Sequence, residues 1–209
     1  NNFTTGDIKN IRPVQYRPFD IRFTYFPMGL INNIIPRGDS RRQLMKNFFD
    51  NNLGLITKRG VSGEWNELFI TKNISDLNFL SAQTYVFPLY LYADDGTKAP
   101  NLKKEIVKEI EKIVGQVKPE NILDYIYAVL HSPNYREKYK EFLKIDFPRV
   151  PYPKDKKQFF ALAKLGEELR HLHLLESPKV NNFITTYPIA DGSLVEKVTY
   201  QNEKVFINK

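Results

Sequence analysis

The sequence predicts an α+β fold in which a basic, β-rich front half packs with a helical back half. Runs of aromatic and β-branched residues dominate up to residue 92, whereas apolar residues recur with helical spacing after residue 100. The 12 Tyr and 15 Phe also favour mixed strand and helix packing over a plain helical bundle. The loop ADDGTKAP at residues 93–100 separates the two patterns. We therefore expect a β-rich part over residues 1–95 and a helical part with short terminal strands over residues 96–209, packed as one compact domain.

The front half contains several strand signals. Residues 14–27 predict a Pro-bounded turn followed by a strand from Ile21 to Phe26. Asp39 and Ser40 can cap a short helix that continues through Phe49. Further strands are expected at residues 53–58, 68–71 and 86–92, with an exposed turn at residues 59–63. Pro88 argues against a central position for the last of these strands, because proline cannot donate a ladder hydrogen bond.

The back half contains helical signals with clear boundaries. Helical spacing predicts helices at residues 106–114, 119–131 and 158–175, and another that begins at Pro133. Gly115 ends the first helix and Pro119 starts the second. Residues 146–153 must be extended because three prolines interrupt them. Two short strands are expected at residues 194–200 and 204–207. The tyrosines of this half, at positions 125, 127, 135 and 139, are expected to pack between helices.

Composition restricts the cellular setting. The chain has no cysteine, which excludes a disulfide framework and a cysteine-based zinc site and favours a reducing, cytoplasmic location. No apolar run reaches the roughly 18 residues that a membrane-spanning helix needs, so we expect no membrane partner. The N-terminus also lacks the pattern of a signal peptide. Because the first residue is Asn1, we expect this chain to be a fragment of a larger polypeptide.

The motifs that would indicate catalysis on DNA are absent from the sequence. There is no Pro-Asp pair of the kind that starts a metal-dependent nuclease motif. There is also no Asn/Asp-Pro-Pro-Tyr/Phe loop and no Gly-rich turn for a methyl donor or a nucleotide. His171 and His173 lie two residues apart on a predicted helix, so they face different directions and do not suit a shared metal. We expect no enzymatic activity, no metal site and no cofactor in this chain.

Positive charge is concentrated at the front of the chain. The formal net charge is +7, and residues 1–60 contain ten Lys and Arg but four Asp, so this segment carries 10 − 4 = +6 of it. Arginine suits planar, bidentate contacts with phosphate and guanine, which indicates a nucleic-acid partner. The candidate DNA-contacting residues are Arg17, Arg22, Arg37, Arg41, Arg42, Lys46, Lys58, Arg59 and Trp65.

Each of these candidates also has a structural alternative. Arg17 and Arg22 lie near Asp20 in sequence and could form an ion pair instead. The basic residues between 37 and 46 surround a predicted helix start, where they could bind phosphate or act as solvated surface charge. Lys58 and Arg59 open a Gly-containing loop, the best position for reading base edges. Trp65 is either an anchor of the core or a contact in that loop.

Five segments, in register, resemble the C-terminal specificity regions of single-polypeptide restriction-modification enzymes. Tyr16–Arg22 with Tyr25-Phe26 is similar to their YRPFDxRxxYY element, although Phe26 replaces the second tyrosine. Residues 52–59 resemble NLxLxxxR, and residues 88–92 spell PLYLY. The blocks 122–151 and 165–175 follow in the same order, so the resemblance covers residues 12 to 175. The families concerned are the type ISP enzymes and the related type IIG and IIL enzymes.

The resemblance implies a target recognition domain that binds double-stranded DNA. In such enzymes this region clamps the duplex against the methyltransferase domain of the same polypeptide. The parent is then expected to be a DNA adenine methyltransferase and endonuclease, with S-adenosylmethionine and Mg²⁺ bound in upstream domains. The alternative is a module whose helical half docks onto another domain of its polypeptide without reading bases.

Overall fold

The computed structural model describes residues 8–26, 44–80, 83–183 and 194–208. The chain divides into two compact units, Asn1–Ser177 and Pro178–Lys209. The strands of the first unit are β1 Ile11–Arg17, β2 Asp20–Tyr25, β3 Gly54–Lys58, β4 Leu68–Thr71, β5 Ile74–Ser75, β6 Thr84–Pro88, β7 Tyr90–Tyr92 and β8 Lys98–Pro100. Its helices are η1 Ile8–Asn10, η2 Lys46–Phe48, α2 Lys104–Val114, α3 Pro119–His131, α4 Pro133–Lys138, α5 Lys140–Leu143 and α6 Lys156–His173. The second unit contains η3 Pro178–Asn181 and the antiparallel hairpin of β9 Val198–Gln201 and β10 Lys204–Ile207.

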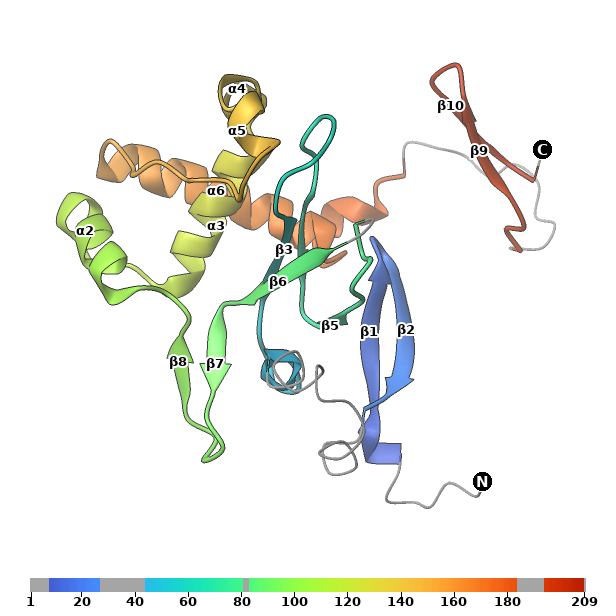
Figure 1. Cartoon of the computed structure of the whole chain (residues 1–209), viewed down its shortest axis with the longest axis horizontal. Helices are drawn as coiled ribbons and strands as arrows, with labels where there is room; N and C mark the ends of the chain where they lie inside the picture. The colour runs from blue at the N-terminus through green and yellow to red at the C-terminus, as the bar shows by residue number, and fades with distance from the viewer. Residues whose placement is uncertain (1–7, 27–43, 81–82, 184–193, 209) are drawn as a thin grey trace. The chain divides into compact units, whose positions relative to one another are not determined.

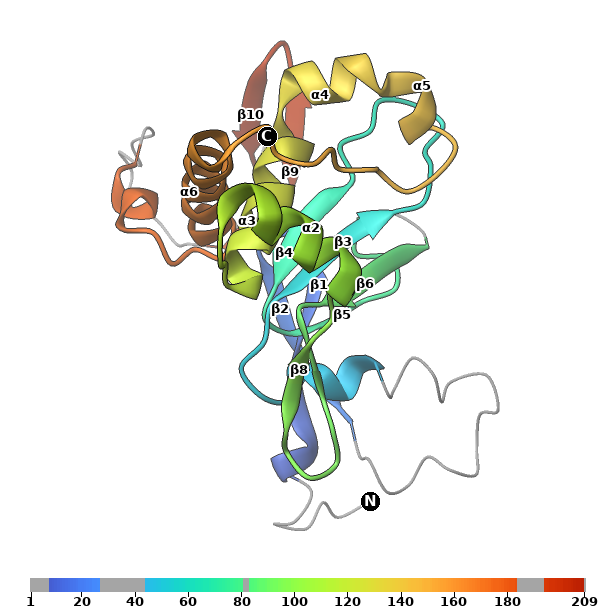
Figure 2. The ribbon, with the colours of Figure 1, turned by 90° about the vertical axis from the view of Figure 1, so that its left-hand side faces the viewer.

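The central element of the first unit is an antiparallel sheet in the order β4-β3-β6; Figure 1 labels β3 and β6, and Figure 2 labels all three strands. Side chains alternate between its two faces, as strand geometry requires. Ile56 pairs with Phe69 and Val86, and all three belong to a smaller core on the side of the β1–β2 hairpin. The next position, Leu55, faces the opposite side and packs against a larger core beneath the helices. The sheet therefore separates two apolar clusters.

The larger core rests on two helices, α3 and α6, that cross and pack against each other (Figure 1). Their backbones approach closely at Gly166, where an added Cβ would lie 1.9 Å from the carbonyl oxygen of Asp124. One turn further along α6, Arg170 donates from Nε and Nη2 to the two carboxylate oxygens of Asp124, at 2.7 and 3.1 Å. Only glycine permits this contact, and the buried ion pair fixes which faces of the helices meet.

The smaller core supports the β1–β2 hairpin. The hairpin is extended by β5, which pairs in parallel with β1 through Val14 and Gln15. At its tip, Phe19 adopts a positive φ of 64°. Its ring packs edge-on against Phe69 of the sheet, with centroids 5.4 Å apart, and near His173 of α6. The tip of the hairpin is thus held between the sheet and the end of the longest helix.

The structure confirms the α+β class, with strands in the front half and helices in the back half. Strands appear where expected at residues 20–25, 54–58 and 68–71, and Pro88 lies on an edge strand. The Pro-bounded turn before the strand is present at residues 18–19, but residues 11–17 ahead of it form β1, a strand that was not expected. The expected strand 86–92 is two strands, β6 and β7, and β7 pairs with β8. The helix expected from Asp39 lies outside the described residues up to position 43, and its end is a single turn, η2.

Two partly buried histidines, His131 and His173, are expected to make the stability of this fold pH-dependent. Burial, Arg136 and His173 lower the pKa of His131 to about 3, and burial also lowers the pKa of His173. The Tyr127 hydroxyl bonds His173 Nδ1 at 2.5 Å. Because the unfolded chain binds these protons near pH 6.5 and the folded chain does not, stability is complete above that pH. It falls as the pH drops from about 6.5 towards 3.

We expect His131→Gln to flatten this acid dependence, because glutamine keeps a hydrogen-bonding acceptor for Arg136 and does not titrate. Each unit of pKa difference corresponds to about 1.4 kcal/mol in the free energy of unfolding. Urea titrations between pH 4 and 7 measure the slope. His171→Gln is the control, because His171 bonds Glu176 at the surface. Equal slopes for parent and His131→Gln would contradict the assignment.

Candidate nucleic-acid interface

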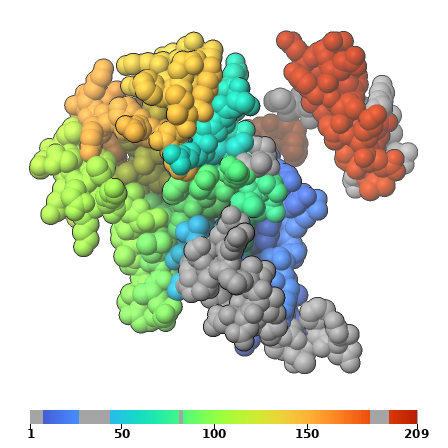
Figure 3. All heavy atoms as spheres, in the orientation of Figure 1, coloured from blue at the N-terminus to red at the C-terminus, as the bar shows by residue number. Residues whose placement is uncertain are grey.

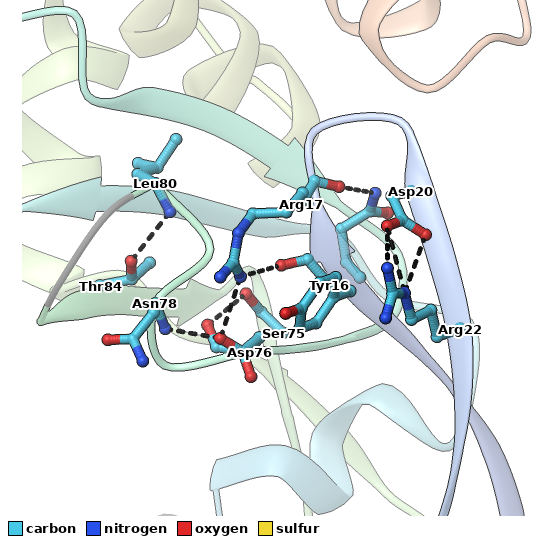
Figure 4. A network of polar contacts seen from close by, with 10 residues as sticks. Tyr16, Arg17, Asp20, Arg22, Ser75, Asp76, Asn78, Leu80 and Thr84 are labelled. Carbon is cyan, nitrogen blue, oxygen red and sulfur yellow. Dashed lines mark hydrogen bonds and ion pairs between the residues drawn. The ribbon is translucent and has the colours of Figure 1, made fainter. Parts of the chain in front are cut away.

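Two arginines of the β1–β2 hairpin converge on a single tyrosine ring (Figure 4). The guanidinium carbons of Arg17 and Arg22 lie 4.2 and 3.9 Å from the ring centroid of Tyr16. The register of the hairpin shifts between Gln15 and Arg17, so Tyr16 occupies a bulge in β1. Bulges redirect side chains, and this one brings both cations to the same ring.

Two carboxylates hold these guanidinium groups. Arg22 donates to both oxygens of Asp20 at 3.1 to 3.4 Å, and this hydrogen bond raises the pKa of Arg22. Arg17 donates to Asp76 at 3.3 Å and to the carbonyl of Tyr16 at 2.6 Å. The Arg17 and Arg22 side chains are nevertheless 42% and 60% exposed. Exposed ion pairs are weak, so these guanidiniums are pre-oriented and remain able to exchange partners.

The loop that follows β5 contacts the β1–β2 hairpin at one end and, through β6, reaches the last residue of β3 at the other. Asp76 donates its backbone N–H to Gln15, and its carboxylate accepts from the N–H of Asn78 at 2.8 Å. Thr84 closes the loop by accepting from the N–H of Leu80 (Figure 4). Thr84 is also the register partner of Lys58 on β3. The hairpin cations and Lys58 therefore belong to one end of the sheet assembly.

Lys58 and Arg59, although adjacent in sequence, serve opposite sides of the sheet. Lys58 follows the alternation of Ile56, which faces the hairpin side. Arg59 donates from Nε to Asp146 at 3.0 Å, in the segment that follows α5. The pKa of Asp146 is lowered, first by the hydrogen bond from the backbone N–H of Phe147 and second by the hydrogen bond from Arg59. This carboxylate therefore stays ionised. Lys58 and Arg59, which were both expected to read bases, therefore lie on two different surfaces of the domain.

The other candidates lie elsewhere. Lys46 donates to Asp94 at 2.9 Å, beside the β7–β8 turn and apart from the hairpin cations. Trp65 is 4% exposed and belongs to the larger core, so of its two expected roles the structure shows the packing role and not a surface contact. Arg37, Arg41 and Arg42 lie outside the described residues.

Sequence reasoning identified one of the residues that orient the cations. Asp20 was expected as an ion-pair partner, and the structure shows this pair for Arg22, whereas Arg17 pairs with Asp76. Tyr16 was not singled out, although it belongs to the same motif as both arginines. Asp76 and Asp146 could not be identified from local sequence, because they lie 59 residues from Arg17 and 87 residues from Arg59, respectively. Within the described residues, no group of three His, Asp or Glu side chains is arranged to hold a metal ion. In the same part of the chain, no helix is long and apolar enough to cross a membrane.

Comparison with known proteins identifies the family. Over residues 2–209 the chain matches the family described as the Type ISP C-terminal specificity domain. The structure is similar to the DrdV–DNA complex determined by cryo-electron microscopy, with 30% identity and a TM-score of 0.65, covering 79% of this chain and 16% of that chain. Comparison with the curated proteins gives no significant match.

Two further solved structures resemble this fold. One is a nuclease-deletion mutant of the Type ISP restriction-modification enzyme LlaGI in complex with a DNA substrate mimic, with 25% identity and a TM-score of 0.58 over 83% of this chain and 14% of that chain. The other is the ATP-dependent Type ISP restriction-modification enzyme LlaBIII bound to DNA, with 21% identity and a TM-score of 0.60, covering 83% and 11%. In each of the three cases, this chain corresponds to less than a fifth of the larger one. On the evidence of the whole-length family match, the chain belongs to the Type ISP C-terminal specificity domains.

Proposed function

We propose that this domain binds double-stranded DNA and recognises a specific target sequence on behalf of a restriction-modification enzyme. The observation that carries the proposal is the pair of exposed guanidiniums, Arg17 and Arg22, held over Tyr16 in a segment with a net charge of +6. Pre-oriented arginine forks suit phosphate oxygens and the O6 and N7 atoms of guanine. The solved relatives named above are described as DNA complexes, which supports the same reading.

The two faces of β2 favour a second contact, with the methyltransferase domain of the same polypeptide. Arg22 and Asp20 lie on one face of the strand, whereas Ile21, Phe23 and Tyr25 lie on the other. These three apolar side chains are exposed, and Phe23 is 74% exposed. An exposed apolar strip of this kind marks a docking surface. The hairpin would then lie between DNA on its charged side and a protein domain on its apolar side.

The chemistry of the parent enzyme belongs to the regions that this chain does not contain. We propose a cytoplasmic DNA adenine methyltransferase and endonuclease whose upstream domains bind S-adenosylmethionine and Mg²⁺. This domain would contribute recognition and no catalytic group. In the alternative function, this domain only docks onto another domain of its polypeptide. Substitutions in the apolar strip would then weaken that docking, and substitutions of Arg17 and Arg22 would have no effect.

We expect duplex DNA to bind the 209-residue chain with an affinity that falls steeply with salt. Arg22→Ala should weaken binding by roughly tenfold and reduce the salt slope by about 1 if the guanidinium contacts a phosphate. Fluorescence anisotropy with a labelled duplex at several salt concentrations measures both. Lys112→Ala is the matched control, because it removes an exposed cation whose partner is Glu109 on α2. No binding at low salt, or equal effects of the two variants, would refute the proposal.

A further inference from the structure

Two large apolar side chains project into solvent at the end of the helical half. Phe142 on α5 is 73% exposed, and Ile145, just beyond that helix, is 75% exposed. Between them, Leu143 is buried in the larger core and fixes the segment to the body of the domain. We refer to Phe142–Asp146 as the apolar tip. Side chains this exposed on a rigid support indicate a contact surface.

The apolar tip is joined directly to the loop that carries Arg59. Gly60 has a positive φ of 68°, and a Cβ placed there would lie 2.6 Å from the carbonyl oxygen of Lys144 and 3.2 Å from that of Ile145. The loop between β3 and β4 therefore packs backbone to backbone on the tip. Figure 3 shows this loop, in turquoise, against the yellow-orange part of the helical half. The ion pair of Arg59 with Asp146 crosses the same junction. A candidate base-reading arginine thus shares one rigid surface with the tip.

Aromatic contacts fix the tip to the sheet from the other side. The ring of Phe147 packs edge-on against Tyr85 and Phe87 of β6, with centroids 5.0 and 5.6 Å apart. Behind Phe142 and Ile145 lies an apolar groove of about 490 Å³. Segment 142–147 is therefore attached to α5, to the β3–β4 loop and to β6. Such support is what a recognition element needs in order to hold its side chains in place.

The charges around the tip indicate an anionic partner. Residues 137–149 contain four cations, Lys138, Lys140, Lys144 and Arg149, and three acids, Glu137, Glu141 and Asp146. Together with Arg59, these residues carry a net charge of 5 − 3 = +2. Two of the acids pair with lysines, Glu141 with Lys144 at 2.8 Å and Glu137 with Lys140 at 3.9 Å. A surface that combines cations with exposed apolar groups suits the major groove, which presents phosphates at its walls and thymine methyl groups on its floor.

We infer that the apolar tip is a second base-reading element, which enters the major groove together with Arg59. Arg59 would donate to guanine, and Asp146 would accept from the N4 amino group of cytosine. Ile145 or Phe142 would contact a thymine methyl group. This inference rests on the proposed DNA binding and adds a specificity-determining carboxylate from the helical half.

The carboxylate is the most discriminating part of the inference. An ionised Asp146 beside DNA is repelled by phosphates, so it favours a site only where a base offers it a donor. In the free domain Arg59 neutralises it at 3.0 Å. On DNA, the same two side chains can separate to meet the guanine and cytosine edges, because an exposed ion pair is cheaply opened.

Selection of bound sequences from a random duplex pool tests the inference on the 209-residue chain. We expect Asp146→Ala to lose the preference for cytosine at one position while the rest of the selected sequence is kept. Phe142→Ala and Ile145→Ala should weaken binding to the parental sequence by roughly tenfold. Leu165→Ala, an exposed apolar position on α6, and Glu109→Ala, which opens an exposed ion pair on α2, are the matched controls.

The outcomes separate this inference from the proposed function. If the parent chain binds DNA and the three tip variants select and bind the same sequences as the controls, the tip does not read bases and the inference fails alone. If those variants keep DNA affinity but lose association with the upstream region of the polypeptide, the tip is a protein contact and the inference also fails. If the parent chain does not bind DNA at low salt, both proposals fall.

Discussion

Replacing Arg170 by methionine is expected to lower the free energy of unfolding by about 3–5 kcal/mol. Arg170 is 7% exposed and its partner Asp124 is 2% exposed, so the substitution leaves a carboxylate buried without its counter-charge. Methionine keeps the length and the apolar stem of the side chain, which isolates the loss of charge and hydrogen bonds. Urea unfolding followed by circular dichroism measures the change.

A double variant distinguishes the buried charge from lost packing. Asp124→Leu combined with Arg170→Met removes both charges, and we expect it to recover most of the lost stability. Lys112→Met, which breaks an exposed pair with Glu109, should change stability by less than about 1 kcal/mol. A double variant as unstable as the single one would show that shape, and not charge, sets the cost.

Gly166→Ala is expected to have the second large effect, a loss of about 3 kcal/mol. The new Cβ would lie 1.9 Å from the carbonyl oxygen of Asp124 and 2.7 Å from its carbonyl carbon, so backbone and not a flexible side chain must move. Better helix propensity offsets only about 1 kcal/mol. Separating α3 from α6 also stretches the Asp124–Arg170 pair one turn away.

Gly63→Ala provides the control for this substitution. No atom lies within 4 Å of a Cβ placed at Gly63, so its effect should stay within about 0.5 kcal/mol. Thermal unfolding of the two variants in parallel makes the comparison. Equal melting temperatures would mean that the helices can move apart at no cost.

The sequence predicted those elements whose signals are local. Helices α2 and α3 have apolar periodicity together with Gly115 and Pro119 at their ends, and β3 and β4 are short apolar runs between turns. Strand β1 was missed because Pro13 and Pro18 indicate a turn, whereas its stability comes from pairing with β2 and with β5, some 60 residues away. Strand β8 was missed because all three of its residues are exposed, so no alternation marks it.

The candidate interface was predictable only in part. Positive charge and motif resemblance indicated Arg17 and Arg22, and the structure brings these two together on Tyr16. Lys58 and Arg59 were both expected to read base edges because they open the same loop, but strand alternation places them on opposite sides of the sheet. The choice between core and surface for Trp65 depended on how the loop folds against α4 and α5, which no local pattern encodes.

The partition of the domain by its central sheet has a consequence for how its sequence can change. The hairpin arginines rest on the smaller apolar cluster, whereas the Asp124–Arg170 pair and the helices rest on the larger one. Substitutions on the two sides share few neighbours, so their effects on stability should add. Under the proposed function, recognition residues on the hairpin side could be exchanged without retuning the helical support on the other side. Retargeting by a few hairpin substitutions would then proceed through folded intermediates.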